Sequence, residues 1–446
     1  MSMNLILKIK FAFISLLLGT TLSAGEISEL VLANGLKIIV KPDHRSSIVV
    51  FQIWYKVGSA YETPGITGIS HLLEHLMYKG IKSDPSGKLF KAMNRIGAKG
   101  NAFTSRDFSY YFHQLEKTHL ALAFELEAER MQNLLFRPEV IELEKRVIEQ
   151  EQKTRLAEDP YLSAYDNLYQ LAYGNTGYGL PVIGLGNDVR NLSLNQINSW
   201  YQQYYQPSNA TVVISGDILP QKAFKLAKQY FSVLPNQSFR HEKTTEPNQI
   251  PIQKIQKRLE LSAPLNIGML LQAYQVPVIS TSQPPWEAYA LEVLAGWLDS
   301  GSDSILNQVL VKKLQLATEI NIIYSPIARY ETLFILELIP AKGASLIDLE
   351  QRVTQLIDQL KTQLMSQTNL KRIKNQIIAT AIYEKDSLFT QAKIIGQAES
   401  VGINWRDDAK YVERIKGISA HQVQKVLQKY FIPKRRTSII QPALKD

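Results

Sequence analysis

The segment Gly68-Ile69-Ser70-His71-Leu72-Leu73-Glu74-His75 contains the most informative pattern in this 446-residue sequence. It is expected to lie on a helix that begins near Thr67, a residue type that caps helix N-termini well. Residues four apart share one face of a helix, so His71 and His75 can offer two imidazoles to a single cation. Glu74 lies one position before the second histidine and therefore points close to the same spot.

Zinc suits this arrangement because proteins bind it through imidazole nitrogens and carboxylate oxygens, commonly with four ligands. Two histidines and one further carboxylate leave one position for water, whose pKa the metal lowers towards neutrality. Glu74 is then free to accept the proton of that water. The alternative is an accidental pair of surface histidines beside a glutamate, which is uncommon in a chain with only seven histidines.

The segments around this helix predict both strands and helices. Residues 30–40 alternate around Asn34-Gly35, which favours a tight hairpin turn, and residues 48–57 are rich in β-branched and aromatic side chains. Further strands are expected at 101–104, 108–115 and 211–215, and helices at 86–96, 120–135, 139–156 and 221–232.

The second half of the chain repeats this order of strands followed by helices. Residues 259–274 are strand-like, and helices are expected at 286–298, 346–365 and 369–384. The polar segment before them lacks apolar periodicity and predicts a linker. We therefore expect two α+β domains: a catalytic zinc-binding domain at 25–235, a linker at 236–256, and a second domain without the zinc motif at 257–446.

The N-terminus has the pattern of a secretory signal peptide. Lys8 and Lys10 precede an apolar run from Phe11 to Leu18, and a small, weakly polar stretch follows as far as Ala24. Residues 1–24 are expected to be removed on export, which leaves a periplasmic or secreted chain without stable membrane insertion. An uncleaved membrane anchor is the alternative, although the apolar run is shorter than a membrane-spanning helix needs.

Composition narrows the chemistry further. The chain has no cysteine, which excludes disulfides and means that any metal is held by histidine and carboxylate side chains. The net charge of +9 arises from 50 basic and 41 acidic residues scattered along the chain. Nucleic-acid binding calls for a concentrated basic face, so no nucleic-acid partner is expected.

The five residues His71-Leu72-Leu73-Glu74-His75 resemble the inverted zinc-binding motif of the pitrilysin-like peptidases, the inverzincins. In that family a glutamate well beyond the second histidine is the third zinc ligand. Glu151, which lies 76 residues after His75, matches its position, and Glu149 is the rival. The resemblance implies one Zn²⁺ per chain, held by His71, His75 and Glu151.

Other residues of the first half extend the resemblance. Glu144, two helical turns before Glu151, matches the family's supporting glutamate, and the catalytic role that this implies is to hydrogen-bond a ligand histidine and fix its tautomer. Residues 101–104 resemble the active-site edge strand, which implies substrate binding by Asn101, Ala102, Phe103 and Thr104. The family's fold implies that each of the two related domains is a mainly antiparallel sheet packed with helices.

The second half departs from the family pattern at one place. Val311 and Thr318 stand where the resemblance would place an arginine and a tyrosine that bind substrate and stabilise the oxyanion. Lys312 and Tyr324 are near in sequence but do not match the pattern. A catalytic chain without the Arg/Tyr pair is expected to obtain it from a related subunit in a heterodimer, and a self-sufficient monomer or homodimer is the alternative.

These features together predict an exported zinc metalloendopeptidase that resembles the catalytic subunit of the mitochondrial-processing-peptidase branch. It is expected to hydrolyse peptides or extended polypeptide segments by attack of metal-activated water, with Glu74 as general base and then proton donor. The alternative is a non-catalytic scaffold or binding subunit of the same fold.

Overall fold

The computed structural model describes residues 26–444 apart from 160, 236–249 and 263–265. The expected signal peptide at 1–24 and most of the expected linker at 236–256 lie outside the described residues. Within the described part of the chain, no helix combines the length and the apolarity that a membrane crossing requires.

The first half contains a six-stranded sheet in the order β1-β2-β6-β3-β5-β4. The predicted hairpin at Asn34-Gly35 is confirmed, because β1 and β2 pair antiparallel on either side of it and Gly35 has φ +86°. All pairs in this sheet are antiparallel except β2 with β6. The strands are β1 (Ser28–Val31), β2 (Lys37–Pro42), β3 (Ile48–Tyr55), β4 (Lys99–Thr104), β5 (Ser109–Glu116) and β6 (Ala210–Gly216).

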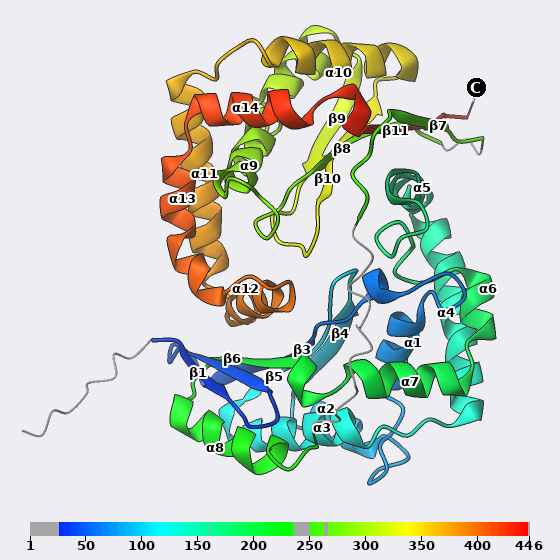
Figure 1. The fold of residues 1–446 in the computed structure, drawn as a ribbon, viewed down its shortest axis with the longest axis vertical. Helices are drawn as coiled ribbons and strands as arrows, with labels where there is room; N and C mark the ends of the chain where they lie inside the picture. Colours follow the sequence, from blue (N-terminus) through cyan, green and yellow to red (C-terminus); the bar gives the residue numbers. More distant parts are fainter. Residues whose placement is uncertain (1–25, 160, 236–249, 263–265, 445–446) are drawn as a thin grey trace, which may run out of the picture.

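The helices of the first half lie in the lower and right-hand parts of Figure 1. They are α1 (Ile69–Leu76), α2 (Lys88–Arg95), α3 (Leu120–Gln132), α4 (Pro138–Glu158), α5 (Leu162–Tyr173), α6 (Gly186–Asn191), α7 (Leu194–Tyr204) and α8 (Pro220–Phe231). Pro138 occupies the first turn of α4, where its missing N–H costs no helical hydrogen bond.

The second half repeats the sheet topology with five strands in the order β7-β11-β8-β10-β9. In both sheets the last strand of the half inserts beside an early strand and runs parallel to it, β6 along β2 and β11 along β7. By this correspondence the edge strands β4 and β9 are equivalent. The strands are β7 (Lys257–Glu260), β8 (Met269–Val276), β9 (Ala317–Ile323), β10 (Thr332–Pro340) and β11 (Arg436–Gln441).

The helices of the second half lie mostly in the upper part of Figure 1, and α12 reaches down to the first sheet. They are α9 (Trp286–Leu298), α10 (Leu346–Leu360), α11 (Gln367–Glu384), α12 (Leu388–Ser400), α13 (Tyr411–Gly417) and α14 (Ala420–Tyr430), with a π-helical turn at Asn307–Lys313. The predicted α+β class with two related, mainly antiparallel sheets is confirmed.

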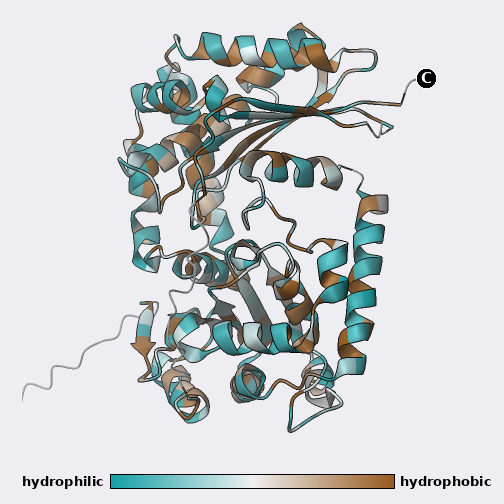
Figure 2. Cartoon of the chain, turned by 45° about the vertical axis from the view of Figure 1, so that its right-hand side comes forward, coloured by the Kyte–Doolittle hydropathy of each residue, from teal (hydrophilic) through white to brown (hydrophobic). Residues whose placement is uncertain are grey.

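Each half lends one helix to the sheet of the other half. Helix α12 lies against β3 and β6 of the first sheet, and α5 lies against β8 and β11 of the second, as Figure 1 shows. The buried cluster beneath α12 combines Trp54 and Val213 with Ile395, and the cluster beneath α5 combines Leu168 with Leu271 and Ile439. Figure 2 shows hydrophobic and hydrophilic residues mixed along the helices, as expected of helices with one face on a sheet.

The strand predicted over residues 259–274 is wrong. Two separate strands, β7 and β8, occupy this region and lie on opposite sides of β11. Gly268 comes directly before β8 and packs closely, since an added Cβ would lie 3.1 Å from Gln441 O. The proline and glycine inside the predicted strand, Pro264 and Gly268, were the sequence signal for a break.

Candidate metal centre

Helix α1 is fixed at its start by two carboxylates from other segments. Glu62 is buried and accepts hydrogen bonds from the backbone N–H groups of Gly68 (2.7 Å) and Ser70 (2.9 Å). The predicted N-cap at Thr67 is wrong, because Gly68 takes that place with φ +82° and Thr67 Oγ1 donates instead to Asp188 Oδ2 at 2.7 Å. Only glycine adopts this left-handed conformation without strain.

Glu62 and Asp188 are positioning residues that the sequence analysis missed. Burial raises the pKa of Glu62 to about 7, although the two N–H donors act in the opposite direction. Glu62 follows the 3-10 turn Ser59–Tyr61, and Asp188 comes from α6, far away in sequence. In the sequence, the only indication of either contact was that the residue is acidic.

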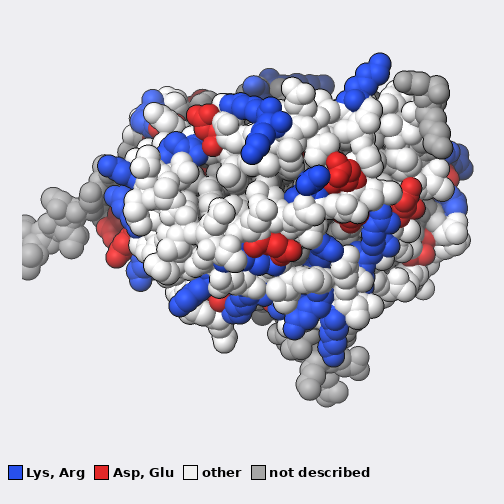
Figure 3. Space-filling model, turned by 90° about the horizontal axis from the view of Figure 1, so that it is seen from above, with Lys and Arg blue, Asp and Glu red and all other residues white. Residues whose placement is uncertain are grey.

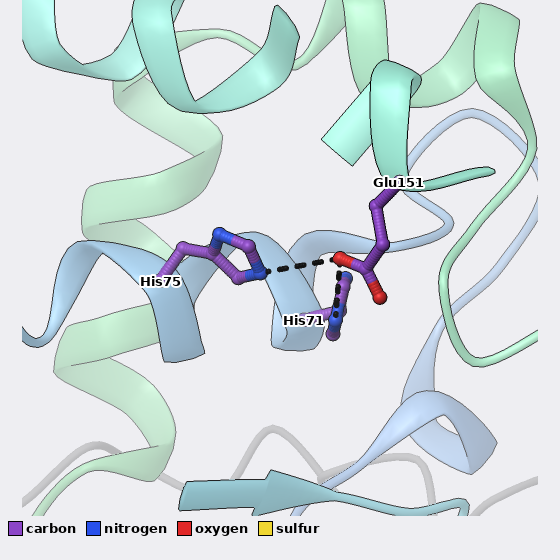
Figure 4. Close-up of side chains that lie close together, drawn as sticks. All are labelled: His71, His75 and Glu151. Atoms are coloured by element: carbon purple, nitrogen blue, oxygen red, sulfur yellow. Dashed lines mark ion pairs between the residues drawn. The ribbon is translucent and has the colours of Figure 1, made fainter. Parts of the chain in front are cut away.

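Three side chains from α1 and α4 converge on one point. Glu151 Oε2 lies 3.8 Å from His71 Nε2 and 3.6 Å from His75 Nε2, and Figure 4 shows the carboxylate facing both rings. One donor atom from each of the three residues lies within 4.8 Å of the others. In the described chain this is the one group of three or more such side chains that could hold a metal ion.

The donor set fits zinc. Burial lowers the pKa of His71 to about 3, with the nearby His75 and Arg155 adding to the effect, so its imidazole is neutral near pH 7. Separations of 3.6 and 3.8 Å exceed a hydrogen bond but approach the ~3.4 Å between two ligands of a tetrahedral ion with bonds of about 2.1 Å. Two imidazole nitrogens and a carboxylate oxygen facing one another are well suited to a shared cation.

Glu144 lies directly behind His75. Its Oε2 is 3.2 Å from His75 Nδ1, and its Oε1 pairs with Lys79 Nζ at 2.8 Å. The Glu144 side chain is only 2% exposed. The ring nitrogen that faces Glu144 is the one turned away from Glu151, so the two carboxylates hold the imidazole from opposite ends.

Glu149, the rival ligand, points elsewhere. Its Oε1 pairs with Arg190 Nη1 at 2.8 Å on the outside of α4, and Glu149 is not a member of the converging group. On a helix a residue two positions from Glu151 faces a different direction, which explains the separation.

Glu74 is held close to the converging group by the edge strand. Thr104 Oγ1, at the end of β4, donates to Glu74 Oε2 at 2.5 Å. Burial is the largest influence on Glu74 and raises its pKa, while the bond from Thr104 and the nearby His75 oppose that rise. A carboxyl whose pKa lies above its usual range is better matched to proton transfer near neutral pH.

The four residues predicted to bind substrate lie together on β4, the outermost strand of the first sheet. Asn101 and Phe103 are exposed, with Phe103 at 54%, whereas Ala102 is half-buried and Thr104 is buried. Among the strands that the structure describes, β4 pairs only with β5, so its other side is open to an added strand.

The structure also shows where the residues of the second half that depart from the family pattern lie. Val311 lies on the π-helical turn, and Thr318 is exposed on β9, the edge strand equivalent to β4. Tyr324 is committed elsewhere, because its hydroxyl donates to Pro277 O at 2.8 Å and its ring stacks on Phe334. Lys312 is half-exposed and lies 3.9 Å from Asp303.

Comparison with solved structures shows that the chain has the fold of a protease. A protease structure from Helicobacter pylori superimposes with a TM-score of 0.87 at 26% identity, covering 94% of this chain and all of that one. The chain belongs to peptidase family M16. The family's "Insulinase (Peptidase family M16)" domain matches residues 37–185, and "Peptidase M16 inactive domain" matches residues 191–377.

Two curated relatives share parts of the sequence. The zinc protease PqqE of Helicobacter pylori is 28% identical over 77% of this chain and 76% of its own length. The mitochondrial-processing peptidase subunit beta of Lentinula edodes is 27% identical over 48% of this chain and 46% of its own length. The name of the second relative marks it as one subunit of a larger assembly.

Proposed function

We propose that this chain is an exported zinc endopeptidase that hydrolyses peptides or extended polypeptide segments. The observation that carries the proposal is the convergence of His71, His75 and Glu151, with Glu74 adjacent and hydrogen-bonded to the end of an edge strand. The relatives named as zinc proteases agree with it. Export rests on the signal-peptide pattern of residues 1–24.

His71, His75 and Glu151 would hold the metal, and Glu144 would fix the ring of His75. When bound, zinc supplies a Lewis acid that polarises a carbonyl and lowers the pKa of water. Glu74 accepts a proton from the attacking water and passes it to the departing amine. Thr104 keeps the Glu74 carboxylate turned towards the end of β4, where the peptide lies.

The peptide is proposed to bind as an extra strand along Asn101 to Thr104. Main-chain hydrogen bonds on the open side of β4 would hold extended segments of many sequences. A peptide strand in this position would pass close to Glu74, because Glu74 is hydrogen-bonded to Thr104 at the end of β4.

A related subunit is proposed to complete the site. Tyr324 has its hydroxyl bonded to Pro277 O, and neither Val311 nor Thr318 can supply a guanidinium or a phenol. A partner that carries the Arg/Tyr pair and lacks a working zinc motif would supply both, in a heterodimer that closes around the substrate. On the face shown in Figure 3, Lys and Arg side chains are more frequent than Asp and Glu, and both are separated by uncharged surface.

The test combines metal analysis with a cleavage assay. The purified chain should contain one zinc per chain and cleave unstructured peptides, alone or with the related subunit. Removing zinc with a chelator should abolish cleavage, and restoring zinc should recover it. A non-catalytic scaffold of the same fold would bind peptide but leave it intact at every zinc concentration.

A further inference from the structure

A cavity of about 530 Å³ lies within the second half of the chain. Its walls come from α9, α11, α12 and the start of α13, together with the loop 324–327 after β9 and the 3-10 turn Trp405–Lys410. Figure 1 shows α11 and α13 side by side, with α12 below them. None of the described residues that line the cavity belongs to the candidate metal centre, and the volume is typical of a small-molecule site.

Much of the lining is apolar. Pro326 and Ile327 come from the loop, Ile377 and Ala381 from α11, and Ile394 from α12. All five residues are only partly buried. Apolar side chains that remain partly exposed around a hollow are stabilised when an apolar ligand covers them.

One polar atom in this lining lacks a partner. Glu292, on α9, accepts a hydrogen bond at Oε1 from the hydroxyl of Tyr411. Its Oε2 is buried and accepts no hydrogen bond from the described residues. A buried carboxylate oxygen without a partner is unfavourable, and a donor on a bound ligand would remove that cost.

The environment of Glu292 opposes its ionisation. Burial raises the pKa of Glu292 to about 7, although the bond from Tyr411 acts in the opposite direction, and the nearby Glu384 adds to the rise. Most of the Glu292 carboxyl is therefore ionised at pH 8. A positive charge beside Oε2 would stabilise the ionised form.

The charges around the cavity also favour a cation. Glu384 and Asp408 line it together with Glu292, and Lys385 is the one basic residue among the described residues of the lining. Lys385 is already paired, because its Nζ lies 2.7 Å from Asp408 Oδ2. An anionic ligand would therefore be repelled by Glu292 and Glu384, and a cationic ligand would be attracted.

Two other polar side chains of the lining already have partners in the protein. The hydroxyl of Tyr324 donates to Pro277 O at 2.8 Å. Gln376 Oε1 accepts a hydrogen bond from Arg372 Nη1 at 3.1 Å. Glu292 is therefore the residue whose chemistry determines which ligand fits.

We propose that this cavity binds a small organic cation, in which a broad apolar or aromatic body carries one amidinium, guanidinium or amine group directed at Glu292. A lysine or arginine side chain of a peptide has the charge but only a slim methylene chain, which would leave much of the apolar lining uncovered. The inference is independent of the proposed peptidase function, because the candidate metal centre takes no part in it.

The test is a calorimetric titration of the zinc-loaded chain at pH 8 with two probes. One is 2-naphthamidine, a flat aromatic cation, and the other is 2-naphthamide, a neutral molecule of nearly the same shape. One naphthamidine should bind per chain, about 10- to 100-fold more tightly than naphthamide, as a hydrogen bond to a buried charged group allows. Removing zinc with a chelator should leave both affinities unchanged.

Two pairs of variants locate the probe. Glu292→Gln removes the charge with little change in shape and should abolish most of the preference for naphthamidine. Glu413→Gln is its matched control, since Glu413 is exposed on α13 and does not line the cavity. Ala381→Trp fills the cavity from α11 and should prevent binding of both probes. Ile382→Trp is the control for it, because Ile382 is 57% exposed and lies outside the lining.

Thermal unfolding of each variant checks that it is folded. If naphthamidine does not bind, or binds no better than naphthamide, the proposal is overturned. A preference that survives Glu292→Gln, or binding that survives Ala381→Trp, would overturn it too. Loss of binding on removal of zinc would place the probe at the metal centre and have the same consequence. None of these outcomes bears on peptide cleavage, so the proposed peptidase function depends on its own test.

Discussion

At the scale of single residues, the most informative side chain is Glu74, because it stands beside the three converging side chains without being one of them. Glu74→Gln should preserve the fold and zinc binding, since His71, His75 and Glu151 remain. Cleavage should fall by about 100-fold to 10,000-fold, the range that a positioned acid–base group contributes. Zinc content and turnover of the same preparation check this, and near-normal turnover would exclude Glu74 as the base.

The carboxylates of α4 differ in what they face, so their substitutions should differ too. Glu151→Gln removes a charged donor from the converging group and should lower zinc occupancy strongly. Glu144→Gln should cost about 10- to 100-fold in zinc affinity or activity, because it acts through the ring of His75. Glu149→Gln is the matched control, since Glu149 pairs with Arg190 on the outside of the helix. If zinc binding depended instead on Glu149, the ligand assignment would be wrong.

At the scale of elements, β4 connects the metal centre to the substrate. Asn101 is exposed near the middle of this edge strand, and its Oδ1 accepts a hydrogen bond from the N–H of Ala102 at 2.9 Å. Asn101→Ala removes that local bond and should loosen the strand. Binding of unrelated peptides should weaken by a similar factor, as measured by affinities for a panel of sequences. A change in the preferred sequence at constant overall affinity would argue against strand addition.

Helix α12 is one of the two helices that couple the halves, and its Gly396 packs directly against the first sheet. A Cβ added at Gly396 would lie 2.1 Å from Trp54 Nε1, inside a packed aromatic cluster. Gly396→Ala should therefore destabilise the chain by about 1–3 kcal/mol. Gly417→Ala, at the end of α13 with open space around it, is the control. Thermal unfolding of both variants decides, and equal midpoints would show that α12 can shift without cost.

These elements also show what the sequence could and could not foretell. Segments with their own periodicity and punctuation, such as β3 and α9, were predicted close to their observed bounds. Helices α5 and α12 were missed, because each packs on the sheet of the other half and local pattern does not encode so distant a partner. The two histidines share one helix, so their meeting was predictable from spacing alone. The meeting with Glu151 depended on the family resemblance, and the support from Glu62 and Asp188 on the tertiary fold.

At the scale of the whole molecule, the two halves share a topology but not a chemistry. Helix α1 follows β3 and carries the histidines, whereas its counterpart α9 follows β8 and carries none. The matching family model for the second half is described as an inactive domain. One half thus holds the candidate metal centre, and the other half supplies α12, which packs on the sheet of the first half.

At the two positions of the second half where the family resemblance places an arginine and a tyrosine, this chain has Val311 and Thr318, which leads to the last prediction. Val311 and Thr318 offer neither a guanidinium nor a phenol, and the hydroxyl of Tyr324 is bonded to Pro277 O. Loss of one oxyanion donor typically costs about 100- to 1000-fold in rate. The isolated chain should therefore bind zinc normally but cleave peptides at least about 100-fold more slowly than the same chain with a related subunit that carries the Arg/Tyr pair.

Tyr324→Phe separates the alternatives: it should not change the rate of the two-subunit enzyme, whereas a self-sufficient chain that uses Tyr324 would lose most of its activity. Full activity of the isolated chain, unchanged by the partner, would rule out the requirement for a heterodimer.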